Sequence, residues 1–247
     1  MNDTASRQLV LVTGGASGIG RGIAELLERT GTCVIPVDLQ PSGHRYGVEL
    51  DITDEGAVMA AVSEIEDRHG PVTGLVNAAG ILGKVHPPER LRLSDWEREL
   101  RVDLTGTFIM ARAAGTLMAG RGAGAIVNIA SIAATSSAPT LAYSAAKAGV
   151  VSLTQSLARS WGRSGVRVNA VSPGFTRTPA LAAGIAAGVL SATNMEEPTA
   201  LGRLLEVGEI AEAVAWLLSP KSSGVTGINL PVDAGYLCGV TWAGYQS

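Results

Sequence analysis

The sequence holds little cysteine, little histidine and no excess of charge of one sign, and each shortage excludes a class of protein. The two cysteines, Cys33 and Cys238, lie far apart and form no CxxC or Cys/His spacing, so we expect neither a disulfide scaffold nor a metal site. The formal net charge is −3 and no long run of Lys or Arg occurs. The sequence therefore predicts no positively charged patch that could bind nucleic acid, and a nucleic acid is not expected as a partner.

Long hydrophobic runs are also missing. No uninterrupted apolar stretch approaches the roughly 18 residues that span a bilayer. Residues 1–8 lack the charged and apolar regions of a signal peptide. We therefore expect a cytoplasmic protein in a reducing compartment, with no membrane partner.

The apolar and glycine content is high enough for one folded domain. The chain has 247 residues, of which 46% are hydrophobic and 31 are glycine. Burial of this much apolar surface can offset the conformational entropy lost on folding, so a disordered chain is excluded. The glycines show no three-residue period, so collagen is excluded. No linker, repeat or low-complexity tract divides the sequence, so residues 1–247 are expected to form a single domain.

Short apolar runs alternate with longer segments of helical period, which predicts an α/β fold of βαβ units around a parallel sheet. The first run is continuously apolar, as is typical of a strand buried on both faces. The expected strands are residues 8–12, 32–38, 46–50, 74–77, 125–131, 166–172 and 228–232. The expected helices are residues 20–30, 54–69, 104–119, 143–162 and 207–218.

Ser94 and Glu97 have the S-x-x-E spacing of a capping box and are expected to open the helix that runs through residues 104–119. Two connections depart from the regular alternation. Residues 39–45 are too few for a crossover helix with its loops. Residues 180–200, rich in Ala and Gly, follow the carboxyl end of a strand and are predicted to form a mobile substrate-binding lid.

A glycine-rich turn, TGGASGIG from Thr13 to Gly20, joins the first strand to the first helix. Its glycines permit a tight turn and let a pyrophosphate approach the backbone. The following helix offers unpaired N–H groups and the positive end of its dipole. Glycines also end strands for structural reasons alone, so the turn by itself is a weak signal.

Asp38 strengthens the nucleotide hypothesis because it ends the second strand, 18 residues after Gly20. An acidic side chain there can accept hydrogen bonds from the adenosine ribose hydroxyls. A 2′-phosphate would meet like charge, and neither Leu39 nor Ser17 supplies a cation to hold it. NAD(H) is therefore predicted over NADP(H), unless Asp38 is an ordinary turn residue.

Tyr143 and Lys147 are four residues apart and share one face of a predicted helix. An ammonium beside a phenol stabilises the phenolate and makes the tyrosine a usable acid/base. Ser131 ends the fifth strand, at the edge where ligands of open α/β sheets bind. A Tyr–Lys pair alone is usually a solvated surface pair, so the surrounding motifs decide.

Taken together, these motifs resemble the short-chain dehydrogenase/reductase family over essentially the whole chain. Thr13–Gly20 resembles its TGxxxGxG turn, and residues 77–80 (NAAG) its segment after the fourth strand. Ser131 with residues 143–147 (YSAAK) resembles its catalytic serine and YxxxK, and residues 173–174 its PG segment. The resemblance implies a Rossmann-like doubly wound parallel sheet of about seven strands with helices on both faces.

The resemblance also implies roles. Tyr143 would exchange a proton with the substrate oxygen, Lys147 would bind the nicotinamide ribose and act on Tyr143, and Ser131 would orient the substrate for hydride transfer. NAD would be the cofactor. The positions implied to bind it are Gly14, Ser17, Gly18, Ile19, Gly20, Asp38, Leu39, Asp51, Ile52, Asn77, Ala78, Gly80, Tyr143, Lys147, Pro173, Gly174, Thr176 and Thr178.

The chain departs from the family pattern at Asp103, where an Asn usually serves a water-mediated proton relay. An ionised Asp cannot donate a hydrogen bond and would counter Lys147. Asp103 is therefore counted with the catalytic residues as either a relay member or a locally paired group. Asp103→Asn is expected to keep or improve turnover. The short 39–45 connection resembles that of some NAD-dependent members, and Ala234 replaces a usual glycine, a minor change unless the position needs positive φ.

The predicted function is NAD(H)-dependent interconversion of a secondary alcohol and a ketone. The open alternatives are a cyclic dihydrodiol or sugar-acid dehydrogenase, a dehalogenase-like relative and a non-catalytic NAD-sensing module. A serine hydrolase is disfavoured because no GxSxG occurs. No Arg or Lys lies between Ala180 and Ala200, so the lid holds no phosphate clamp, although Arg177 is near. The Ala-rich helices could pack closely between subunits, and the family resemblance implies a homotetramer or homodimer.

Overall fold

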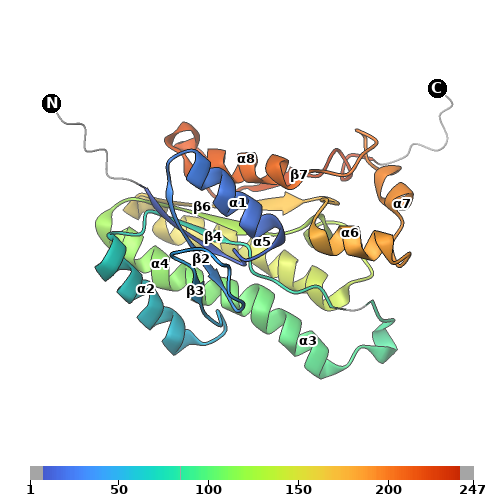
Figure 1. The fold of residues 1–247 in the computed structure, drawn as a ribbon, viewed down its shortest axis with the longest axis horizontal. Helices are drawn as coiled ribbons and strands as arrows, with labels where there is room; N and C mark the ends of the chain where they lie inside the picture. The colour runs from blue at the N-terminus through green and yellow to red at the C-terminus, as the bar shows by residue number, and fades with distance from the viewer. Residues whose placement is uncertain (1–7, 84, 240–247) are drawn as a thin grey trace.

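A single parallel sheet of seven strands organises the chain in the computed structural model, which describes residues 8–83 and 85–239 (Figure 1). The strand order is β3-β2-β1-β4-β5-β6-β7, with every neighbouring pair parallel. This confirms the predicted doubly wound α/β architecture. The strands are β1 Leu9–Thr13, β2 Cys33–Asp38, β3 Val48–Glu49, β4 Gly74–Asn77, β5 Gly124–Ile129, β6 Val166–Pro173 and β7 Asn229–Val232.

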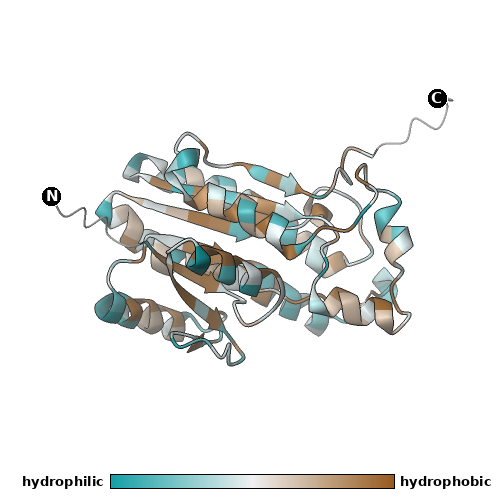
Figure 2. Cartoon of the chain, turned by 45° about the horizontal axis from the view of Figure 1, so that its top comes forward, coloured by the Kyte–Doolittle hydropathy of each residue, from teal (hydrophilic) through white to brown (hydrophobic). Residues whose placement is uncertain are grey.

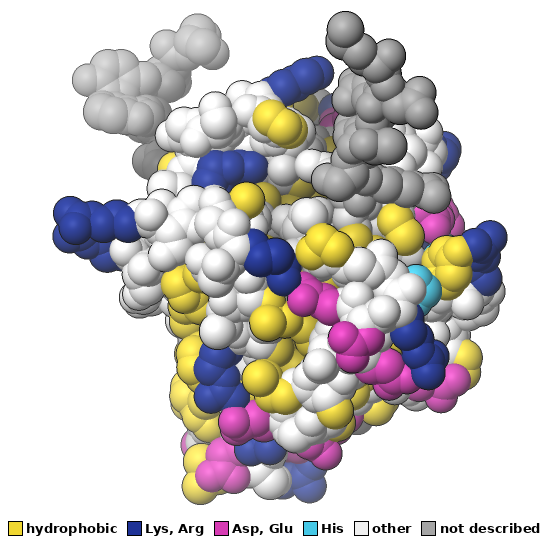
Figure 3. All heavy atoms as spheres, turned by 90° about the vertical axis from the view of Figure 1, so that its left-hand side faces the viewer, with side chains coloured by type: hydrophobic (Ala, Val, Ile, Leu, Met, Phe, Trp, Pro, Cys, Tyr) yellow, Lys and Arg dark blue, Asp and Glu magenta, His cyan; other side chains and the backbone are white. Residues whose placement is uncertain are grey.

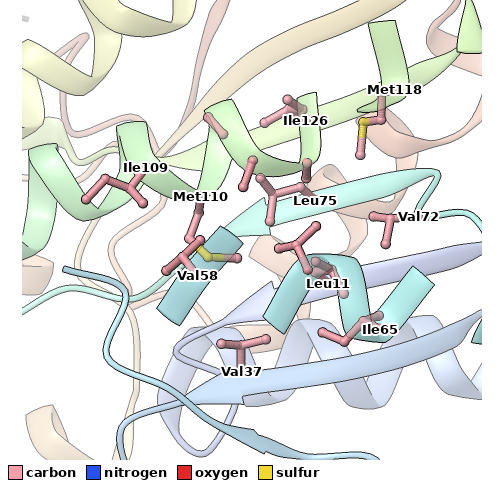
Figure 4. Close-up of a cluster of buried hydrophobic side chains, with 14 of the residues drawn as sticks. Leu11, Val37, Val58, Ile65, Val72, Leu75, Ile109, Met110, Met118 and Ile126 are labelled. Atoms are coloured by element: carbon pink, nitrogen blue, oxygen red, sulfur yellow. The ribbon is translucent and has the colours of Figure 1, made fainter. Parts of the chain in front are cut away.

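Helices cover both faces of the sheet because alternate strand residues point to opposite sides. Val10 and Val12 of β1 pack under α1 (Gly18–Arg29) and α8 (Val207–Leu218). Leu9 and Leu11 belong to the second core, shown in Figure 4. In Figure 2 the strands are largely hydrophobic, whereas the helices carry hydrophilic residues on their outer surfaces. The helices over the second core are α2 Glu55–His69, α4 Thr107–Arg121 and α5 Leu141–Trp161.

The predicted capping box at Ser94 and Glu97 is wrong. Helix α3 (Leu93–Leu100) begins one residue before Ser94, and its N-cap is Arg92, whose guanidinium donates to the Asp95 carboxylate at 2.7 and 2.9 Å. A capping box does occur, at Glu206 and Glu209, where it opens α8. No side chain caps the N-terminus of α3; the Arg92–Asp95 ion pair spans its first turn instead of a serine hydroxyl.

The helix predicted through residues 104–119 contains an irregular segment that the pattern did not indicate. Between α3 and α4, residues Arg101–Gly106 form a π-helical segment, η2, which carries Asp103. π-Helical insertions are rare and are frequently found at functional sites. The Thr107 hydroxyl donates to the Asp103 carbonyl at 2.7 Å and caps one of the displaced backbone groups.

The remaining differences are in length. The strand expected at residues 46–50 is only Val48–Glu49, and the helix expected from Tyr143 begins two residues earlier. Residues 180–200 contain two short helices, which lie beyond the carboxyl ends of the strands (Figure 1). These are α6 Pro179–Ala186 and α7 Ala192–Glu196; single helical turns are η1 Pro88–Arg90, η3 Ile132–Ala134, η4 Gly162–Ser164 and η5 Pro220–Ser222.

The opposite end of the molecule carries a mixed surface. Figure 3 shows Lys and Arg side chains interspersed there with acidic and hydrophobic ones, without a large patch of one sign. None of the helices in the described part of the chain combines the length and the apolar character needed to cross a membrane. Ligands of open α/β sheets bind at the carboxyl ends of the strands, the end of this sheet beyond which α6 and α7 lie (Figure 1).

Candidate functional site

The glycine-rich turn is locked onto the end of β4 by backbone contacts. The Thr13 hydroxyl accepts hydrogen bonds from the Ala78 and Ala79 N–H groups at 3.0 and 3.1 Å. Gly14 has φ +67°, and a Cβ on it would lie 2.8 Å from the Ala79 Cα atom. Gly20 is equally constrained, since its Cβ would lie 2.3 Å from the Gly14 carbonyl oxygen. Tight backbone packing thus explains three of the motif positions.

The start of α1 is open, in contrast to the turn that precedes it. Gly18 has φ +54°, and a Cβ on it would meet only the Thr178 methyl group, at 4.0 Å. Ser17 is exposed and occupies the N-cap without a side-chain capping bond to the described residues, and Ile19 beside it is half-buried. The free N–H groups of this helix end and the space over Gly18 fit the pyrophosphate of a dinucleotide.

Asp38 lies next to this turn at the end of β2. Its carboxylate accepts hydrogen bonds from the Ala16 N–H and the Gln40 N–H, both at 3.0 Å. Asp38 is half-buried and Leu39 is 64% exposed. The carboxylate therefore braces the turn and still presents its remaining lone pairs at the carboxyl edge.

The next strand end carries two further predicted cofactor residues. Asp51 is exposed and accepts a hydrogen bond from the Thr53 N–H at 2.8 Å. Ile52 is buried, and its side chain packs where a Cβ on Gly106 would lie. Asp51 is thus accessible to a ligand, whereas the Ile52 side chain is part of the core.

Asn77 points into the protein rather than toward the edge. Its amide nitrogen donates to the Asn128 side-chain oxygen at 2.9 Å, and Asn128 donates in turn to the Thr154 hydroxyl at 2.9 Å. All three side chains are buried. The Asn77 side chain is thus turned into the interior, while Ala78 is half-buried and Gly80 exposed at the end of β4. Sequence reasoning missed Asn128 and Thr154, although a polar residue inside the apolar run of β5 is a signal for such a network.

Tyr143 and Lys147 meet at the end of β5, as their spacing predicts. The Lys147 ammonium lies 5.5 Å from the centre of the Tyr143 ring and donates to the Ile129 carbonyl at 3.0 Å. Lys147 is 4% exposed and Tyr143 is half-buried. Ser131 lies two residues after the end of β5, rather than at its last position as predicted, and caps η3, where its hydroxyl accepts from the Ala133 N–H at 3.1 Å. A buried cation, a phenol and a hydroxyl thus gather at one strand end.

Asp103 joins this group from the π-helical segment. Its side chain is fully buried, with Oδ2 3.6 Å from the Lys147 ammonium and Oδ1 accepting from the Ile81 N–H at 2.8 Å. Burial raises the pKa of Asp103 above its usual range, although Lys147 opposes the shift. Gly80 makes room for the pair, since its Cβ would lie 3.2 Å from Asp103 Oδ2 and 3.3 Å from Lys147 Nζ.

The segment after β6 closes the edge from the other side. Pro173 ends β6, and Gly174 packs on Asp233, whose Cα a Gly174 Cβ would approach to 2.7 Å. The Thr176 hydroxyl donates to the Gly174 carbonyl at 2.9 Å, and Thr178 caps α6 by accepting from the Leu181 N–H at 3.2 Å. The Thr178 methyl would lie 4.0 Å from a Cβ on Gly18, so the two sides of the predicted cofactor site approach each other here.

Ala234 and Arg177 qualify the sequence interpretation. Ala234 has φ +53°, so the position does need positive φ, and an alanine there is strained by about 1–2 kcal/mol relative to glycine.

Arg177 is engaged with two carboxylates, at 3.0 Å from Glu206 and 3.8 Å from Glu196. Its charge is therefore already balanced within the fold.

Comparisons with known proteins agree with this geometry. Residues 14–237 match the family described as enoyl-(acyl carrier protein) reductase. The chain is 40% identical to the cis-4-hydroxycyclohexanecarboxylate dehydrogenase of Sinomonas cyclohexanicum, covering 96% of this chain and 99% of that one. It is 37% identical to the D-threitol dehydrogenase of Mycolicibacterium smegmatis, covering 93% and 92%. The chain belongs to the short-chain dehydrogenase/reductase family.

Solved structures share the whole fold. One named ribose-5-phosphate isomerase, from Brucella melitensis 16M, is 46% identical with a TM-score of 0.92 and covers 97% of this chain and 96% of its own. ElxO with NADP bound is 27% identical with a TM-score of 0.89, covering 94% and 99%. The family uses a nicotinamide dinucleotide, and the open start of α1 lies where such a cofactor would need its phosphate site.

Proposed function

We propose that this protein is a nicotinamide-dependent oxidoreductase that interconverts a secondary alcohol and a ketone. The proposal is supported by the Lys147 ammonium, which lies 5.5 Å from the centre of the Tyr143 ring and next to Gly80 at the end of β4, with Ser131 just after β5. Gly80 contacts Lys147 on one side, and the adjoining Ala79 packs against Gly14 on the other. A proton-handling group and a pyrophosphate cradle thus share one edge of the sheet.

Each side chain has a chemical task in this proposal. The bound nicotinamide would accept or return a hydride. Tyr143 removes the proton from the alcohol oxygen in oxidation and returns it in reduction. Lys147 stabilises the phenolate through its charge, and Ser131 holds the substrate oxygen by a hydrogen bond. Gly14, Gly18 and Ser17 hold the pyrophosphate, Asp38 the adenosine ribose, and the backbone of residues 173–178 the nicotinamide end.

We propose NAD(H) as the preferred cofactor because Asp38 places a carboxylate beside the turn. Asp38→Asn keeps an oxygen that can accept from the Ala16 N–H but removes the charge. We expect kcat/KM with NADP to rise by about tenfold, corresponding to about 1.4 kcal/mol of relieved repulsion. Asp67→Asn, an equal charge change at an exposed position of α2, serves as the control and should alter neither cofactor's kcat/KM. Equal kcat/KM of the unmodified protein with the two cofactors would refute the preference.

The substrate we propose is a medium-sized, largely uncharged polyol or cyclic secondary alcohol. Arg177, the cation next to α6, is occupied by Glu206 and Glu196. The sequence from Ala180 to Ala200 contains no Arg or Lys. A phosphate or carboxylate on the substrate would therefore find no free cation in this segment.

The test is a substrate panel followed by absorbance at 340 nm with NAD or NADP. The panel holds cyclohexanols, cyclic diols, hydroxycyclohexanecarboxylates, tetritols and hexitols, and a separate assay measures conversion of ribose 5-phosphate. Reduction of the cofactor by at least one neutral alcohol supports the proposal. Ketose formation from ribose 5-phosphate without any cofactor reduction would identify an isomerase instead. Retained NADH binding with no turnover of any compound would identify the non-catalytic alternative.

We also propose a homodimer or homotetramer. Phe108 and Leu117 on α4 are 38% and 37% exposed, and α4 and α5 are rich in small residues that allow close packing. Light scattering that gives the mass of one chain would contradict this proposal.

A further inference from the structure

A pocket of about 520 Å³ lies between α3 and the segment that leads from β4 through η1 to this helix (Figure 1). Its volume is in the range that holds a small organic molecule. None of the described residues that line it belongs to the glycine-rich turn, to the predicted cofactor positions or to the predicted catalytic group. The pocket is therefore a second candidate site, separate from the one already described.

One wall of the pocket carries a carboxylate without a partner. Glu99 lines the pocket and is 6% exposed, and its carboxylate makes no hydrogen bond or ion pair with the described residues. A Cβ on Gly83, which lines the same pocket, would overlap the Glu99 carboxylate, so this group lies at the wall. A buried polar group without a partner costs free energy. A ligand in the pocket that donates a hydrogen bond would supply the missing partner.

The outer part of the pocket carries positive charge that the fold leaves unpaired. Arg90 and Arg98 are both exposed, and neither forms an ion pair with the described residues. The third arginine of the pocket differs, because Arg92 donates to the Asp95 carboxylate at 2.7 and 2.9 Å. That pair balances itself, and two guanidinium groups are left for an anion.

Apolar side chains complete the lining. Leu82 is 67% exposed, and Ile81 and Leu91 in the same pocket are half-buried. Covering such apolar surface with the apolar part of a ligand is favourable. The pocket thus combines two unpaired cations, one unpartnered carboxylate and an apolar surface.

We infer that this pocket binds a small amphipathic carboxylate that also carries one hydrogen-bond donor, as an amino acid or a hydroxy acid does. The ligand carboxylate pairs with Arg98 and Arg90, whose planar guanidinium groups match two oxygens. Its ammonium or hydroxyl group donates to Glu99, and its apolar chain covers Leu82. The inference goes beyond the proposed function and does not depend on it.

The combination of groups disfavours simpler ligands. Inorganic phosphate would pair with the two arginines but would leave Glu99 without a donor and near a like charge. A neutral alcohol would satisfy Glu99 and leave both arginines unpaired. Selectivity for a ligand that carries both groups is therefore the property that identifies the site.

Isothermal titration calorimetry of the cofactor-free full chain tests this selectivity. The probes are leucine, the hydroxy acid with the same carbon skeleton, the carboxylic acid that lacks the amino and hydroxyl groups, and inorganic phosphate. We expect leucine or its hydroxy analogue to bind at least about tenfold more tightly than the last two probes, because hydrogen bonds to charged groups contribute that much. Binding of none of the probes, or equal binding of all four, would overturn the proposal.

Arg98→Gln should weaken the binding by about tenfold, because it removes one charge that faces the ligand carboxylate. The matched control is Arg159→Gln, which removes an exposed arginine of α5 that likewise forms no ion pair with the described residues. The control should bind like the unmodified protein. Equal affinities of the two variants would show that Arg98 does not contact the ligand.

Glu99→Gln separates the two kinds of donor. The amide oxygen still accepts a hydrogen bond but carries no charge, so leucine should lose about tenfold in affinity and the hydroxy acid less. Glu97→Gln makes the same change at an exposed position of α3 outside the pocket and should alter neither affinity. Unchanged leucine binding by Glu99→Gln would refute the role of this carboxylate. If Glu99→Gln is insoluble, Arg98→Gln and the probe series decide.

Hydrogen–deuterium exchange locates the bound ligand. At saturation, the amides of residues 81–83 and 90–99 should exchange more slowly, whereas those of residues 131–147 and 173–178 should keep their rates. Protection of the latter two segments instead would place the ligand in the proposed catalytic site and overturn a separate pocket. These measurements need no turnover, so a protein without dehydrogenase activity would refute the proposed function and leave this site established.

Discussion

Tyr143→Phe is expected to lower kcat for every accepted alcohol by about 10²–10⁴-fold, the range that general acid–base catalysis contributes. The phenol oxygen is the only atom removed, so the ring keeps its position over the Lys147 ammonium. Binding of NADH, measured by fluorescence, should weaken far less than kcat falls, because Tyr143 is one of many positions implied to bind the cofactor. The loss therefore reports on proton transfer rather than on folding or cofactor affinity.

A matched control is available in Tyr46, a half-buried tyrosine whose ring packs against His69 far from the predicted catalytic group. Tyr46→Phe removes the same atom and should leave kcat and NADH binding unaltered. Oxidation that proceeds at full rate in Tyr143→Phe would refute the assignment of the acid/base. An equal loss in Tyr46→Phe would show that the effect is structural.

Gly14→Ala is expected to destabilise the fold by about 1–2 kcal/mol for the left-handed backbone and by a further ~1–3 kcal/mol for overpacking. The clashing atoms are the backbone of Ala78 and Ala79, at 2.8–2.9 Å, and they cannot rotate away. Relief of the clash would pull the turn from the end of β4, so NADH binding should weaken together with stability. Urea unfolding and NADH titration measure the two effects.

Gly43 separates the two contributions. It has φ +69°, close to the +67° of Gly14, but a Cβ there would meet no described atom within 4 Å. Gly43→Ala therefore incurs only the backbone cost, and the stiffening of the unfolded chain is the same for both variants. Equal destabilisation by the two substitutions would show that the contact between the turn and residues 78–79 contributes nothing.

Local patterns were sufficient for the elements and for the motifs along each of them. The continuous apolar run of β1 and the alternation of strands with helices predicted the parallel sheet, because each depends on side-chain period alone. The four-residue spacing of Tyr143 and Lys147 predicted a shared helix face, and α5 supplies it. The S-x-x-E pattern at Ser94 misled because α3 begins one residue earlier, at Leu93, which places Ser94 inside the first turn instead of at the N-cap.

Contacts between residues far apart in the sequence could not be predicted from such local patterns. The buried chain of Asn77, Asn128 and Thr154 joins two strands and a helix that lie 26 to 51 residues apart. The π-helical segment that turns Asp103 toward Lys147 leaves no signature in the residue spacing. Its effect depends on which helices and loops enclose the carboxyl group.

By itself, the order of residues determined that this chain folds as a parallel α/β sheet with a glycine-rich turn and a Tyr–Lys pair. Those features depend on the period of a strand or helix and on the backbone freedom of glycine, which neighbouring residues set. Only the tertiary structure decided that Asp103 is buried 3.6 Å from the Lys147 ammonium and that the Asn77 side chain faces inward. Burial and the loss of water around a charge arise from the packing of distant segments, and no local pattern contains them.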